Sequence, residues 1–218
     1  MIVLGSIVTL AIFLFVGWAV STEMFQQRAW RQRVAEGDVG IIAALVEEAL
    51  SSWRRERPPA GVGASTWAGV NAAQVVAVSA DGVTLSSSAE AEFRTEGSAR
   101  VQVASALDSG IAIAAKLVDR LLYDVPNLRP GTVRVDIYST FTEGDGQPVQ
   151  KPILSTTAAR SIADDLTWDA LTPAELLGRF STTYDRGPAG VANPIILPPI
   201  EGMFARDIAN LSASNEAN

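Results

Sequence analysis

Apolar and polar positions divide the chain into one long apolar run followed by segments with helical or strand periodicity. Residues 2–20 contain no charged side chain and no proline. A helix over these residues would be about 28 Å long, close to the hydrocarbon thickness of a bilayer. Because lipid offers the backbone no hydrogen bonds, such a run is stable there as a helix. The pattern predicts a transmembrane anchor over 1–21, marked by Ile2, Leu10, Phe13, Phe15 and Trp18.

Two other interpretations of the apolar run fit less well. A cleavable secretory signal has a basic start, a shorter apolar core and a small-residue cleavage site. Here no Lys or Arg precedes the run, and residues 19–21 offer a poor site. A type IV prepilin would carry a glutamate where Leu10 stands. A retained anchor is therefore expected.

Arginines follow the run but do not precede it. Arg28, Arg31 and Arg33 lie within fifteen residues of its end. Basic residues stay on the cytoplasmic side, so the amino terminus is expected outside and the rest of the chain in the cytoplasm, at the plasma (inner) membrane. The same arginines could also contact anionic headgroups, although topology alone accounts for them.

Helical periodicity appears in three later segments. Residues 22–59 are expected to form juxtamembrane and connecting helices, with Asp38 as an N-cap and Pro58 ending the second helix. A second amphipathic pattern covers 105–123. Thr172 and Glu175 form a capping box at the start of a short helix.

Period-two alternation predicts strands over 74–79, 83–94, 100–104, 132–141 and 149–157. Such alternation is typical of a sheet with one face in water. Pro152 would mark an edge strand, and residues 60–66 a flexible linker. The expected fold is α+β: a domain over 60–187 whose mainly antiparallel sheet of about five strands is covered by helices on one face.

The last segment, 188–218, is punctuated by prolines and cannot continue a regular element. It is expected to be extended and to lie in a groove, because an apolar segment left exposed to water would favour aggregation. The groove could belong to its own domain or to a partner subunit. The residues predicted to form this interface are Ile195, Ile196, Leu197, Pro198, Pro199 and Ile200.

The chain contains no histidine and no cysteine. This excludes Ser-His-Asp and Cys-His nucleophile systems, zinc sites with imidazole or thiolate ligands, and cysteine-ligated clusters. The net charge is −7, so the surface repels phosphate backbones and nucleic-acid binding is not expected. No cofactor is predicted.

One acidic group is a candidate metal site. Asp164, Asp165 and Asp169 could hold a divalent cation through their oxygens. Acidic residues beside short helices more often serve as caps and dipole partners.

These observations favour a non-catalytic accessory or assembly subunit of a larger membrane complex, for which a bioenergetic complex is one fitting class. Its partners would be the bilayer and other membrane subunits. The alternatives are a membrane-tethered enzyme that uses carboxylates and a divalent metal, and a sensor that takes a small ligand. The missing catalytic side chains argue against an enzyme without excluding one.

Overall fold

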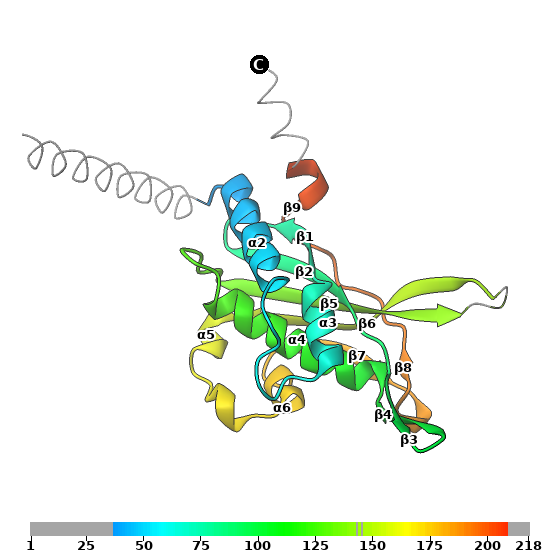
Figure 1. Cartoon of the computed structure of the whole chain (residues 1–218). Helices are drawn as coiled ribbons and strands as arrows, with labels where there is room; N and C mark the ends of the chain where they lie inside the picture. Colours follow the sequence, from blue (N-terminus) through cyan, green and yellow to red (C-terminus); the bar gives the residue numbers. More distant parts are fainter. Residues whose placement is uncertain (1–36, 143, 145, 209–218) are drawn as a thin grey trace, which may run out of the picture.

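The computed structural model describes residues 37–142, 144 and 146–208, which form an α+β domain around one large sheet (Figure 1). The predicted anchor and the three arginines behind it lie outside the described residues. Within the described ranges, no helix has the length and apolarity needed to cross a membrane.

The sheet has seven strands in the order β8-β7-β6-β5-β2-β1-β9. Their bounds are β1 Gln74–Val78, β2 Gly82–Ser88, β5 Thr132–Thr142, β6 Pro148–Ala159, β7 Ser181–Arg186, β8 Ala192–Asn193 and β9 Met203–Phe204. Neighbouring strands are antiparallel except β2 and β5, which are parallel. The sheet is mainly antiparallel, as predicted, but it has seven strands instead of about five, and it contains one parallel pair that was not expected. A helix that crosses from β2 to β5 returns the chain to the same end of the sheet, so the two strands run the same way.

The two long helices confirm their predicted periodicity. In α2 (Val39–Trp53), the Asp38 side chain accepts hydrogen bonds from the first turn, and the apolar stripe is buried in its own domain. In α4 (Ala106–Tyr123), Ser105 and Asp108 form a capping box. Gly110 lets α4 approach the sheet closely, because an added Cβ would lie 3.1 Å from Ile137 of β5.

Shorter helices also cover the face of the sheet on which α4 packs. They are α3 (Ala64–Asn71), α5 (Arg160–Ala163), η1 (Trp168–Ala170) and α6 (Pro173–Leu177), with η2 (Pro188–Gly190) after β7. The Thr172 capping box at α6 is confirmed. The predicted linker over 60–66 extends only to Gly63, because α3 begins at Ala64 and buries Trp67 against the core.

Two strands stand apart from the main sheet. The long strand expected over 83–94 breaks after Ser88, and β3 (Glu92–Glu96) pairs with β4 (Ala99–Ala104) as a separate hairpin. In this hairpin Phe93 is 44% exposed, although the alternation over 83–94 groups it with the buried residues Val83 and Leu85. Pro152 does not lie in an edge strand, because β6 pairs with both β5 and β7, although the β7 pairing covers only 154–157.

The chain after β8 crosses the sheet on the face opposite the helices. Residues 194–202, here called the strap, have no regular structure and lead to β9 at the other edge of the sheet (Figure 1). Gly202 has φ +101° and its added Cβ would lie 2.6 Å from the carbonyl oxygen of Val78, so only glycine fits this turn without strain. Residues 188–208, the described part of the predicted tail, therefore lie on their own domain. They are not wholly extended chain as expected, because they form η2 and contribute β8 and β9 to the sheet.

The sheet has two distinct ends. At the near end, Gly37 lies against Ala80 in the β1–β2 turn, and β9 pairs with the end of β1. At the far end, β2 leads into the β3–β4 hairpin and β7 turns into β8. Both ends of the described chain, at 37 and 208, thus emerge close to the near end (Figure 1).

Candidate functional site

The strap is held to the sheet through its main chain. Arg134 on β5 donates from Nη1 to the carbonyl of Pro199 at 2.8 Å and from Nη2 to the carbonyl of Pro198 at 3.0 Å. The Ile195 amide donates to the carbonyl of Pro152 on β6 at 2.9 Å. These bonds fix the backbone of the strap without using its side chains.

A buried network positions Arg134. Its Nε donates to Oδ1 of Asp136 at 2.9 Å, and the Ser155 hydroxyl donates to the same oxygen at 2.6 Å. Ser155 stands directly opposite Asp136 on β6, which explains the contact. The Arg134 and Asp136 side chains are 9% and 1% exposed. This face of the sheet was expected to be in water, but Arg134 and Asp136 on it are buried beneath the strap.

The neighbouring tyrosine reports the same environment. Tyr138 follows Asp136 on the same face of β5 by strand alternation. Burial, and secondarily the Asp136 carboxylate, raise the pKa of its phenol.

The predicted interface residues are not equally covered. Ile195, Leu197 and Ile200 are half-buried, whereas Pro198 and Pro199 are exposed. Ile196 is 94% exposed. Two more exposed apolar side chains lie on the adjoining chain, Val191 at 61% and Tyr184 at 46%. Tyr184 pairs with Leu154, whose side chain is in the core, so Tyr184 belongs to the helical face of the sheet and not to the face that the strap crosses. We call the exposed side chains of the strap itself, Ile196, Pro198 and Pro199, the strap patch.

A cleft of about 370 Å³ lies between the strap and the near end of the sheet. Hydroxyl groups of Ser79, Thr84, Thr132 and Thr157 line it, together with Arg134 and the carboxylates of Asp81 and Glu201. A second cleft of about 320 Å³ lies beside α4, with apolar walls that include Trp168 and Leu176 and with Lys116 among its lining residues.

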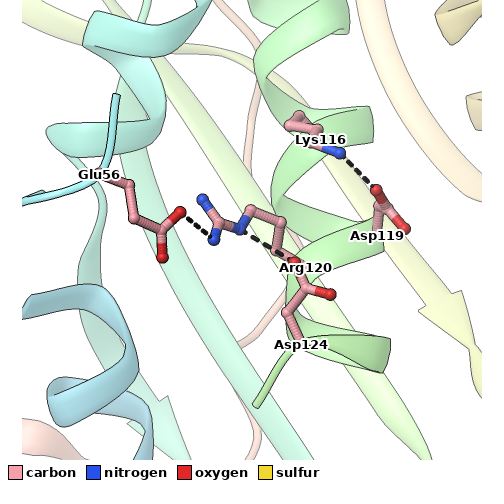
Figure 2. A network of polar contacts seen from close by, with 5 residues as sticks. All are labelled: Glu56, Lys116, Asp119, Arg120 and Asp124. Atoms are coloured by element: carbon pink, nitrogen blue, oxygen red, sulfur yellow. Dashed lines mark hydrogen bonds and ion pairs between the residues drawn. The ribbon is translucent and has the colours of Figure 1, made fainter. Parts of the chain in front are cut away.

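A second arginine joins the helices. Figure 2 shows Arg120 of α4 pointing toward Glu56, which follows α2, with the Lys116–Asp119 pair one turn away. Arg120 donates to Glu56 at 2.6 Å and to Asp124 at 3.2 Å. Its guanidinium also lies 4.4 Å from the ring centre of Trp53 and 5.4 Å from that of Trp67. With its side chain 8% exposed, Arg120 ties α2 and α3 to α4.

The three aspartates proposed as a metal site have different neighbours and do not form one site. Asp164 accepts from the Tyr123 hydroxyl at 2.9 Å and lies 3.9 Å from Arg160, while Asp169 lines the cleft beside α4. Asp165 is exposed. Among the described residues, no group of three or more acidic side chains is placed to hold a metal ion.

The Tyr123 contact supports a titration experiment. Burial first, and then the Asp164 carboxylate, raise the pKa of Tyr123 to about 12. We expect the Tyr123 signal in an absorbance titration at 295 nm to appear above pH 11, and to be missing in Tyr123→Phe. The pKa of Tyr123 in the folded state exceeds the usual value near 10. The stabilisation that comes from the neutral Tyr123 hydroxyl is therefore complete below pH 10 and is lost as the pH rises toward 12. A tyrosine signal near pH 10 that disappears in Tyr123→Phe would contradict the contact between Tyr123 and Asp164.

Periodicity alone did not reveal the two buried arginines. Arg134 and Asp136 alternate with valines, which predicted a wet face, and Arg120 occupies an edge of a helix. The feature of the sequence that could have indicated the buried pair is two opposite charges two positions apart in one strand. Such pairs are also common on exposed faces of sheets.

Comparisons of the chain with protein-family models, with curated proteins and with solved structures found no match.

Proposed function

We propose that this chain is a non-catalytic accessory or assembly subunit of a larger membrane complex, held by a transmembrane anchor over 1–21. The domain would lie in the cytoplasm, with the amino terminus outside. Bound partners would be other subunits of that complex, of which a bioenergetic complex is one fitting class. The strap patch is the proposed docking surface.

One observation carries this proposal: Ile196 is 94% exposed on a backbone that is fixed on both sides. The Ile195 amide is bonded to Pro152, and Arg134 holds the carbonyls of Pro198 and Pro199. An exposed aliphatic side chain on a fixed main chain loses little conformational entropy on docking. A few well-packed residues carry most of the binding free energy of a protein interface, so a change at one of them can abolish binding.

Replacing Ile196 with aspartate is expected to abolish co-purification of stoichiometric membrane subunits in mild detergent. Because the side chain is exposed, the melting temperature of the isolated protein should barely change, as the cost of such surface substitutions is usually within about 0.5 kcal/mol. The measurement is subunit stoichiometry after affinity purification from native membranes.

A matched control is Ile162→Asp on α5, since Ile162 is 46% exposed on the helical side of the domain. This variant should keep its partners. If Ile196→Asp retains the full complement of subunits, the strap patch is not the docking surface. If the wild-type protein purifies as a lone monomer, the proposed role is wrong.

A further inference from the structure

The cleft between the strap and the near end of the sheet has a floor of polar side chains that the strand register lines up. Thr84 of β2 stands directly opposite Arg134 of β5, and Arg134 stands directly opposite Thr157 of β6. Residues paired in this way lie on the same face of a sheet, so the three side chains form one row across three strands. All three line the cleft, whose volume is about 370 Å³.

The Thr84 hydroxyl in this row is buried without a partner from the protein. Thr84 is 7% exposed, and within the described ranges its hydroxyl makes no hydrogen bond. The same holds for the hydroxyl of the half-buried Thr157. A buried hydroxyl without a hydrogen bond costs free energy, so native structures provide it with a partner. Here the partner has to come from the contents of the cleft, either water or a ligand.

Arg134 adds hydrogen-bond donors to the floor but no unmatched charge. Its Nε is bonded to Asp136, and its Nη1 and Nη2 are each bonded to a carbonyl of the strap. A guanidinium has five N–H groups, so two remain for a ligand. Because the Asp136 carboxylate already balances the charge of Arg134, an anionic ligand would gain little from it.

Two carboxylates lie at the rim of the cleft. Asp81 belongs to the turn between β1 and β2, and Glu201 lies in the strap just before β9. The Gly131 amide donates to Oδ1 of Asp81 at 3.0 Å, which holds this carboxylate in place. Carboxylate oxygens accept hydrogen bonds from a ligand and repel anions. The cleft therefore disfavours phosphates and other anionic ligands.

We propose that this cleft binds a small neutral polyol of the size of a monosaccharide or a cyclitol. The hydroxyl groups of a polyol can donate to the carboxylates and accept from the guanidinium, and threonine hydroxyls can do either. A neutral ligand leaves the Arg134–Asp136 pair undisturbed. The volume lies toward the lower end of the range for small-molecule sites, which fits one ring, and the exposed rings of Pro198 and Pro199 supply an apolar wall.

Calorimetric titration of the full chain in mild detergent tests this site with three probes, namely myo-inositol, D-glucose and D-galactose. We expect saturable binding of at least one probe, with a dissociation constant of about 1 mM or tighter. The absence of saturable binding for all three would overturn the proposal. Binding of the diamine putrescine without binding of any polyol would also overturn it and assign the cleft to cations.

Valine substitutions locate the binding. Thr84→Val and Thr157→Val remove a hydroxyl and keep the branched shape of the side chain. Each should weaken binding of the best probe roughly three- to tenfold, the usual effect of one hydrogen bond. The melting temperature should be retained, because within the described part of the chain neither hydroxyl has a partner to lose.

Thr142→Val is the matched control, since Thr142 is exposed at the opposite end of β5 and does not line the cleft. This variant should bind the probe as the wild type does. Equal affinities for Thr84→Val, Thr157→Val and Thr142→Val would show that the probe binds elsewhere and would overturn the proposal.

The polyol site goes beyond the docking role of the strap patch, although Pro198 and Pro199 belong to both. Ile196 does not line the cleft, so Ile196→Asp should bind the probe like the wild type. The subunit stoichiometry of Ile196→Asp tests the docking surface, and the affinity of Thr84→Val tests the cleft. A failure of either proposal is therefore distinguishable from a failure of the other.

Discussion

Replacing Arg134 with methionine is expected to destabilise the domain by about 3–5 kcal/mol, because the Asp136 carboxylate would remain buried without its cationic partner. Asp136 is 1% exposed, and it would keep only a neutral side-chain donor, the Ser155 hydroxyl, in the part of the chain that the structure describes. For a protein of this size, each kcal/mol lowers the melting temperature by roughly 2–4 °C, so a loss of about 6 °C or more is expected. The measurement is thermal unfolding of the full chain in detergent.

The same substitution should release the strap. Arg134 supplies both hydrogen bonds to the carbonyls of Pro198 and Pro199, so Arg134→Met should make residues 194–202 sensitive to limited proteolysis. Replacing Asp136 with leucine in addition removes the unpaired charge and should restore much of the melting temperature, but not the protection of the strap. If Arg134→Met melts like the wild type and its strap stays protected, the buried network has no such role.

The second large effect is expected at Arg120. Arg120→Met should cost about 2–3 kcal/mol, since it removes two charge-assisted hydrogen bonds and the stacking on Trp53 and Trp67. Glu56 and Asp124 are about half exposed and would be solvated by water, so the loss should be smaller than at Arg134. Tryptophan fluorescence during thermal unfolding would follow this change, because both indoles contact the guanidinium.

Lys116 supplies a matched control on the same helix. Its bond to Asp119 is equally short, 2.7 Å, but both side chains are about one-third exposed (Figure 2). Exposed ion pairs of this kind contribute about 0–1 kcal/mol, so Lys116→Met should leave the melting temperature nearly unchanged. Arg120→Lys should recover little, because an ammonium cannot bond both carboxylates in the planar geometry of a guanidinium. Equal effects of Arg120→Met and Lys116→Met would contradict this account.

The elements predicted correctly are those whose signals lie close together in the sequence. The α4 stripe repeats over eighteen residues, and the caps at Asp38 and Thr172 involve partners two or three positions away. In β5, apolar Val133, Val135 and Ile137 alternate with the polar residues between them. In contrast, α3 has a weak pattern next to glycines, and β7 is rich in serine and threonine, so neither was predicted.

The candidate site depended on contacts that no local pattern contains. Arg134 reaches the strap across 64 and 65 positions of sequence. Strand alternation correctly grouped Arg134 with Asp136, but it could not say what covers their face. The aspartates 164, 165 and 169 are close in sequence, yet helix and turn geometry directs them to different neighbours.

The sequence by itself determined the positions of the main helices and strands, the absence of imidazole and thiol chemistry, and the lack of regular structure in the strap. Periodicity, caps and prolines act within a few residues, so these properties are readable along the chain. Tertiary structure alone decided the parallel pairing of β2 with β5, the separate β3–β4 hairpin, and the burial of Arg134 and Asp136 beneath the strap. Strand order and burial are set by which distant segments exclude water from each other, and that depends on the whole packed domain.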